Sequence, residues 1–123
     1  MNQLGLAIVR FEVIVEGITA AALLLVPGTV ARLLFGVDLP AVGGIVARIA
    51  AIALLSLVLC CWLVRQTGLR HALVALLAYN VMTAAYLGLV GIQGAPVGIL
   101  FWPAAVVHAV VAGLLTLGWR RSA

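Results

Sequence analysis

The sequence predicts an all-α integral membrane protein, built as an antiparallel four-helix transmembrane bundle. Of its 123 residues, 67% are hydrophobic and 8% are charged, whereas soluble domains are about 45–50% apolar and about 25% charged. Four apolar segments each reach the roughly 20 residues that a spanning helix needs, and in lipid their backbone polar groups must be satisfied internally. We therefore expect a single transmembrane domain over residues 1–123, with helices at roughly 4–26, 41–64, 70–91 and 96–118.

The residues between these segments are typical of helix ends. Pro27 and the glycine after it end the first segment, and Asp38, two residues before a proline, is the predicted N-cap of the second. Glycine-containing loops at 66–68 and 91–95 precede the third and fourth segments. The longer first connection has room for a short helix at 30–35 in the membrane interface. The other loops are short, so sequential helices should be antiparallel neighbours.

The arginines predict the orientation. The net charge of +4 comes from seven arginines and three acidic residues, and cytoplasmic loops of membrane proteins carry an excess of Lys and Arg. Four arginines flank the second loop or follow the last segment: Arg65, Arg70, Arg120 and Arg121. We therefore expect a multi-pass protein of the bacterial plasma (inner) membrane with both termini cytoplasmic, and with Trp62 and Trp119 near that interface.

The same arginines predict the lipid bilayer, and not nucleic acid, as the partner. They stand singly or at the ends of apolar runs, whereas a nucleic-acid binder needs a solvent-facing basic stripe. The first segment lacks a basic start and contains two glutamates, so we expect it to be retained as a helix and not removed as a signal peptide.

The two cysteines, Cys60 and Cys61, are adjacent in the second segment and do not form a disulfide framework. We expect both to be buried thiols. The alternative is a soft-metal site, because mercury-uptake membrane proteins also use paired cysteines in a helix. No Cys or His spacing typical of metal ligands supports it, so no metal is predicted, and the cofactor stays unknown.

A polar layer is the main functional feature of the sequence. Each predicted helix carries one strongly polar residue at a similar depth: Glu16, Arg48, Asn80 and His108. In a core about 30 Å thick, Glu16 lies roughly 18 Å from the inner edge and Arg48 roughly 10 Å from the outer edge, so we expect the two to pair. Glu12 shares the helix face of Glu16 but lies nearer the cytoplasmic edge. Charges at mid-membrane cost about 2.5–3.5 kcal/mol on insertion scales and usually face the bundle interior.

Two interpretations of this layer remain open. It can be an interhelical polar lock that serves assembly alone, or a site that also contacts a ligand or a proton. Tyr79 and Thr83 add polar groups on the third segment, and Trp102 either lines a pocket or packs. The predicted ligand-binding set is Glu12, Glu16, Arg48, Tyr79, Asn80, Thr83, Trp102 and His108.

Three stretches carry a resemblance to a known group of proteins. ARIAAIALLSLVLCCW at 47–62, AYN at 78–80 and FWPAAVVHA at 101–109 resemble small four-helix bacterial membrane proteins, similar in layout to the DoxX-like families. Some of those families are associated with quinone-linked redox systems. We therefore expect the bundle to hold a hydrophobic or amphipathic small molecule, quinone or lipid-like, alone, as a homo-oligomer or as a subunit of a larger membrane complex. The resemblance assigns no role to any residue.

Two other functions fit the same residues. A membrane glutamate in the first of four short helices is similar to small multidrug exporters, which favours a proton-coupled transporter with Glu16 as the coupling carboxylate. Alternatively, Glu16 and His108 are candidate catalytic residues, the acid and base of a membrane isomerase or cyclase. The sequence contains no nucleophile elbow, phosphate loop or metal motif, so enzymatic activity stays open.

Overall fold

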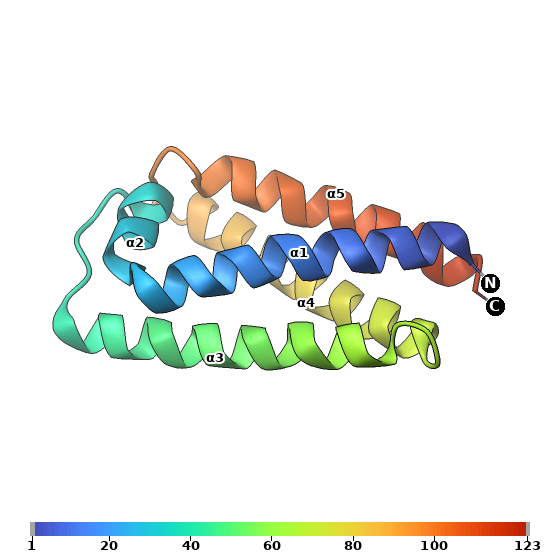
Figure 1. Cartoon of the computed structure of the whole chain (residues 1–123). Helices are drawn as coiled ribbons and strands as arrows, with labels where there is room; N and C mark the ends of the chain where they lie inside the picture. Colours follow the sequence, from blue (N-terminus) through green and yellow to red (C-terminus); the bar gives the residue numbers. More distant parts are fainter. Residues whose placement is uncertain (1, 123) are drawn as a thin grey trace.

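The chain is entirely helical where it has regular structure. The computed structural model describes residues 2–122, which contain no strand and five helices: α1 (Gln3–Leu25), α2 (Pro27–Phe35), α3 (Ala41–Val64), α4 (Leu69–Ile92) and α5 (Phe101–Arg120) (Figure 1). Helices α3, α4 and α5 are each long and apolar enough to cross a membrane, and α1 with α2 forms a fourth candidate span bent by 112°. The prediction of an all-α chain with several helices long and apolar enough to span a membrane is therefore confirmed.

The break between α1 and α2 lies where proline predicts it. Pro27 occupies the first turn of α2, where its missing N–H costs nothing. Helix α2 ends at Gly36, which adopts the left-handed conformation (φ 68°) and donates its N–H to the Arg32 carbonyl. Asp38 accepts a 2.6 Å ion-pair hydrogen bond from Arg32 Nε. The prediction of Asp38 as an N-cap is wrong, because Pro40 occupies that position without a side-chain cap.

The last helix begins later than the sequence predicts, at Phe101 instead of near residue 96. The residues before it bond to α2: Gly98 N–H donates to the Leu34 carbonyl at 2.7 Å, and Leu100 N–H to the Leu33 carbonyl at 2.9 Å. Carbonyls in the last turn of a helix have no partner within it, so this segment caps α2. A Cβ atom at Gly98 would overlap the Leu33 carbonyl, which explains the glycine.

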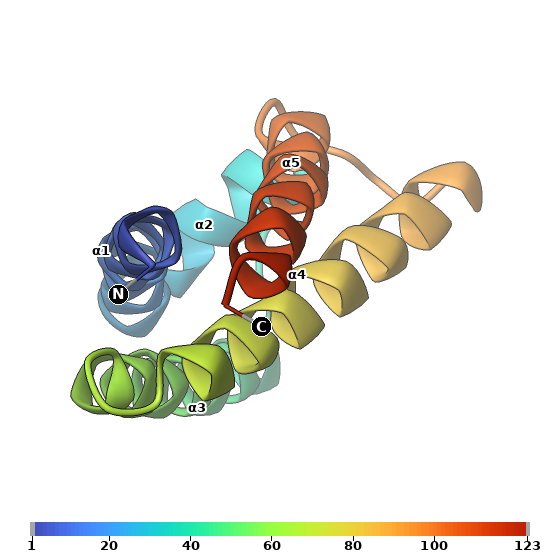
Figure 2. The ribbon, with the colours of Figure 1, turned by 90° about the vertical axis from the view of Figure 1, so that its right-hand side faces the viewer.

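The helices pack unequally. Helix α4 packs most extensively against α5, and α1 against α3, while α3 and α4 contact each other less. The long helices α1, α3, α4 and α5 reverse direction from one to the next in Figure 1, and both termini lie beside the α3–α4 loop. Seen along the other helices, α4 is strongly inclined and moves away from α3 toward its C-terminal end (Figure 2). The inclination of α4 leaves its C-terminal half less covered by α1 and α3.

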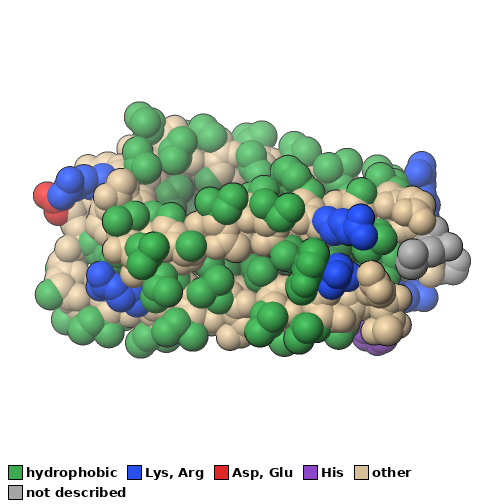
Figure 3. Space-filling model, viewed as in Figure 1, with side chains coloured by type: hydrophobic (Ala, Val, Ile, Leu, Met, Phe, Trp, Pro, Cys, Tyr) green, Lys and Arg blue, Asp and Glu red, His purple; other side chains and the backbone are tan. Residues whose placement is uncertain are grey.

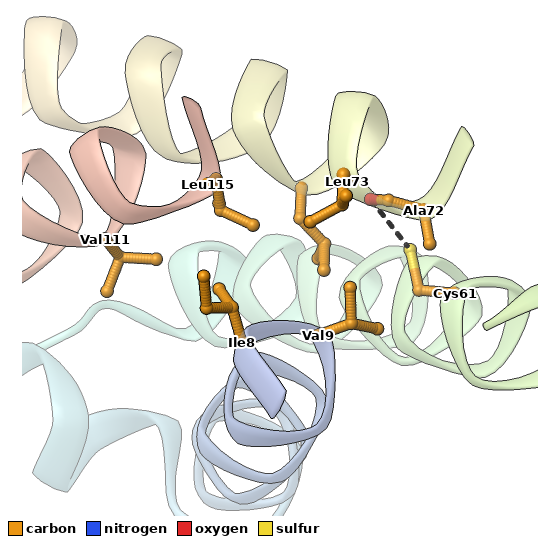
Figure 4. Packing of buried hydrophobic residues seen from close by; sticks show 8 residues of the cluster. Ile8, Val9, Cys61, Ala72, Leu73, Val111 and Leu115 are labelled. Carbon is orange, nitrogen blue, oxygen red and sulfur yellow. Dashed lines mark hydrogen bonds between the residues drawn. The ribbon is translucent and has the colours of Figure 1, made fainter. Parts of the chain in front are cut away.

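The apolar core lies at the end of the molecule that holds the termini. It combines side chains from all four long helices (Figure 4): Ile8, Val9, Cys61, Ala72, Leu73, Leu76, Val111 and Leu115. Cys61 is 2% exposed there, whereas Cys60 is exposed. The prediction that both thiols are buried is therefore wrong for Cys60, because consecutive residues of a helix point about 100° apart.

The outer surface is apolar over its middle. Figure 3 shows hydrophobic side chains covering the central part of the visible face, with the arginine side chains lying toward the two ends. At the end that holds the termini, Arg65 lies over the Trp62 ring at 3.4 Å and Arg70 over the Trp119 ring at 5.4 Å. A surface with an apolar middle and arginine–tryptophan pairs at one end is typical of helices that cross a bilayer.

Candidate functional site

Two carboxylates are buried on the inner face of α1. Glu12 is 1% exposed and Glu16 is 3% exposed, and their spacing of four residues places them on one helix face. Arg10 and Thr19 of the same helix are exposed. The packing of α1 against the other helices thus encloses both acidic side chains and leaves the basic one outside.

Glu12 belongs to a hydrogen-bonded chain that crosses three helices. Asn80 of α4, which is fully buried, donates from Nδ2 to Glu12 Oε2 at 2.7 Å. On its other side Asn80 Oδ1 lies 2.8 Å from His108 Nδ1 of α5. A single amide therefore connects a carboxylate of α1 to an imidazole of α5.

A backbone carbonyl fixes which groups donate and which accept in these hydrogen bonds. Asn80 Nδ2 also donates to the Leu76 carbonyl at 3.0 Å, and a carbonyl can only accept. The amide nitrogen must therefore face Leu76 and Glu12, which leaves Oδ1 as the acceptor toward His108. It follows that His108 Nδ1 carries the hydrogen, and that in the neutral ring Nε2 is an acceptor.

Glu16 has its own partners on α4 and α5. The Tyr79 hydroxyl donates to Glu16 Oε2 at 3.1 Å, and His108 Nδ1 lies 3.9 Å from Glu16 Oε1. The Tyr79 and His108 rings meet edge to face, with centroids 5.7 Å apart. Thr83 lies beside the Tyr79 hydroxyl. We call Glu12, Glu16, Tyr79, Asn80 and His108 the polar cluster; its members come from α1, α4 and α5.

Arg48 lies outside the polar cluster, and the predicted Glu16–Arg48 pair is wrong. The Arg48 side chain is exposed and donates from Nε to the Leu24 carbonyl at 3.1 Å. Leu24 lies in the last turn of α1, where carbonyls lack helical partners. The Arg48 side chain therefore does reach α1, but at its C-terminal end, eight residues beyond Glu16 and about 12 Å along the helix axis.

Trp102 also lies apart from the polar cluster. Its side chain is 48% exposed and packs edge to face on Phe101, with ring centroids 5.4 Å apart. The ring also lies so close to Gly91 of α4 that a Cβ atom there would be 2.6 Å from it. Of the two roles considered for Trp102, the structure therefore supports packing between the end of α4 and the start of α5.

An open groove reaches the polar cluster from the apolar surface. Its volume is about 380 Å³, and it is lined by Leu23, Ala50, Ala53, Leu54, Leu57 and Tyr79. Tyr79 is the one member of the polar cluster among these residues. The α3 residues follow the i, i+3, i+4, i+7 pattern of one helix face. This surface was not predicted from the sequence, and its signal there is the pair of alanines on α3 opposite a tyrosine of α4.

A second groove, between α1 and α5, is purely apolar. It has a volume of about 310 Å³ and is lined by Ala7, Ile8, Phe11, Val111 and Leu114. Since it has no polar lining residue, it offers nothing to orient a ligand. Within residues 2–122, no three His, Cys, Asp or Glu side chains gather closely enough to hold a metal ion.

The two candidate catalytic residues lie together in the polar cluster, with Glu16 Oε1 and His108 Nδ1 3.9 Å apart. Comparison of the chain with known protein families, with curated proteins and with solved structures finds no match. The DoxX-like relationship thus stays a prediction, and the function has to be argued from the groove and the polar cluster.

Proposed function

We propose that the protein is an antiparallel four-helix bundle of the bacterial inner membrane, with α1 as the fourth span and α2 in the interface. Helix α1 has 23 residues, which at 1.5 Å each is roughly 34 Å, enough to cross the hydrocarbon core. Its two glutamates face other helices and not lipid. The arginines at 65, 70, 120 and 121 favour a cytoplasmic location for the termini and the α3–α4 loop.

The proposed function is to bind a hydrophobic or amphipathic small molecule, quinone or lipid-like, in the groove between α1, α3 and α4. One observation carries this proposal: Tyr79 lines the apolar groove and also donates a hydrogen bond to Glu16. Small-molecule sites are mostly apolar concavities of about 300–1,000 Å³ with a few polar groups that orient the ligand. The apolar body of the ligand would contact leucines and alanines, and its polar end would reach Tyr79.

Filling the groove tests this proposal. Ala53 lines the groove and is exposed, as is Ala109 on α5, which does not line it. We expect Ala53→Phe to abolish the thermal stabilisation of nanodisc-embedded protein by a short-chain benzoquinone or a lysophospholipid, and Ala109→Phe to preserve it. Native mass spectrometry of protein purified from its membrane should show a retained small molecule that Ala53→Phe loses. Equal behaviour of the two variants would rule the groove out.

A second candidate function is proton-coupled transport with Glu16 as the coupling carboxylate. It is favoured by the burial of both glutamates without an arginine partner among residues 2–122. Uncompensated charge is costly in the membrane, so such carboxylates are typical of proton and ion pathways. Substrate-dependent proton flux in liposomes that Glu16→Gln abolishes would establish this function. Ligand binding without flux would leave the binding function alone.

A further inference from the structure

The polar hydrogens of the cluster are already used within it. Both Asn80 Nδ2 hydrogens go to Glu12 and to the Leu76 carbonyl. The single hydroxyl hydrogen of Tyr79 goes to Glu16, and the Nδ1 hydrogen of His108 goes to Asn80. Only the Thr83 hydroxyl, beside Tyr79, can turn to donate or to accept. A ligand that needs hydrogen-bond donors would have to break existing bonds.

The open positions of the cluster are acceptors. Within residues 2–122, no hydrogen bond reaches Oε1 of Glu12, Oε1 of Glu16 or Nε2 of His108. The two carboxylates are buried, 1% exposed for Glu12 and 3% for Glu16, and they lie behind Tyr79, which lines the groove and bonds to Glu16. The cluster therefore holds unused acceptors next to the groove.

The charge of the polar cluster also favours a cationic ligand. Its two carboxylates have no arginine partner, because the described arginine–carboxylate pair joins Arg32 to Asp38, and Glu16 has the His108 ring 3.9 Å away. Arg48, the predicted partner, bonds to the end of α1 instead. An anionic head group would face two carboxylates, and a quinone, whose carbonyls accept hydrogen bonds, would find at most the Thr83 hydroxyl as a donor. A cation that donates N–H bonds matches both the charge and the acceptors.

We propose that the ligand of this site is an amphipathic amine, bound as its ammonium form. The N–H groups contact the free carboxylate oxygens of Glu16 and Glu12, and the apolar tail lies in the groove between α1, α3 and α4. The edge of the site contributes the Tyr79 ring, which lines the groove and whose face attracts cations. This inference rests on the proposed binding function and, among amphipathic small molecules, selects amines over quinones and anionic lipids.

A matched set of probes with one apolar body tests the ligand class. Octylamine, octyltrimethylammonium, octanol and octanoate are titrated by calorimetry at pH 7 into protein in nanodiscs of zwitterionic lipid, with empty nanodiscs subtracted. Octylamine is fully protonated there, because alkylamines lose their proton only near the pKa of lysine, about 10.4. We expect octylamine to bind at least roughly tenfold more tightly than octanol, since hydrogen bonds to charged groups contribute more than neutral ones, and octanoate not to bind.

Single variants test whether the preference for octylamine depends on the polar cluster. Glu16→Gln retains the shape of the side chain and should reduce octylamine binding roughly tenfold while octanol binding stays unchanged. That unchanged binding also demonstrates that the variant is folded. Ser56→Ala, at an exposed α3 position, is the control and should change neither.

Each other outcome refutes a defined part of the proposal. Octanol binding as tightly as octylamine, or a short-chain benzoquinone binding more tightly than both, would overturn the amine and leave the groove as a binding site. Octyltrimethylammonium binding as tightly as octylamine would refute the N–H contacts, since it carries the charge without a donor. If no probe binds and Ala53→Phe changes nothing, the binding function itself fails, and the amine fails with it.

Discussion

The hydrogen bond between Asn80 and Glu12 should couple α1 to α4 energetically. Removing Asn80 leaves the buried carboxylate of Glu12 without its 2.7 Å donor and leaves the Nδ1 hydrogen of His108 without its 2.8 Å acceptor. A double-mutant cycle of Asn80→Ala and Glu12→Ala isolates the pair, because each single variant removes the same contact.

The magnitude follows from the kind of contact. Hydrogen bonds between membrane helices average about 0.6 kcal/mol in such cycles and reach about 1.7 kcal/mol, and a charged partner roughly doubles the strength of a neutral bond. We therefore expect a coupling free energy of about 1–2 kcal/mol. Each single variant should destabilise by about 2–3 kcal/mol, because a fully buried polar group loses its partner.

The assay is equilibrium unfolding of the detergent-solubilised protein, with the four forms of the cycle compared under one condition. Glu16→Ala with Arg48→Ala is the matched control: these residues belong to different contacts, so their free-energy losses should add within about 0.5 kcal/mol. Additive losses for Asn80 and Glu12 would refute the hydrogen-bonded chain. Coupling between Glu16 and Arg48 would show that α3 is rotated from its position in the structure.

Three further outcomes can be checked with single variants. Gly98→Ala should lower the free energy of unfolding by more than about 1 kcal/mol, because its Cβ overlaps the Leu33 carbonyl, whereas Gly113→Ala, in open space, should be neutral or stabilising by up to about 1 kcal/mol. Cys61→Ala should cost about 1 kcal/mol through a small core cavity, and Cys60→Ala less than about 0.5 kcal/mol; thermal unfolding in detergent measures both, and equal costs would contradict the difference in burial. In a cysteine-free background, a cysteine at position 67 should resist impermeant thiol reagents added to intact cells, and labelling from outside would reverse the proposed orientation.

Local chemistry predicted the spans and their breaks. The apolar runs of α3 and α4 coincide with the expected segments because a spanning helix must satisfy its own backbone and show apolar side chains to lipid. Pro27 ends α1 by removing a donor that a continuous helix would need. The spacing of Glu12 and Glu16 was sufficient to place both on one face. The sequence alone therefore determined the class of protein, the helices and the polar residues available to a site.

The tertiary structure decided which of these polar residues meet. Depth along a helix can be read from the chain, but the rotation of each helix about its own axis depends on packing against the others. In the folded chain Arg48 reaches the Leu24 carbonyl, near the end of α1, while Asn80, Tyr79 and His108 surround the two glutamates. The late start of α5 has the same kind of cause, since the residues before it bond to α2, far away in the chain. Interhelical contacts of this kind have no local signature, so the composition of the site and the acceptors it leaves free depended on the fold.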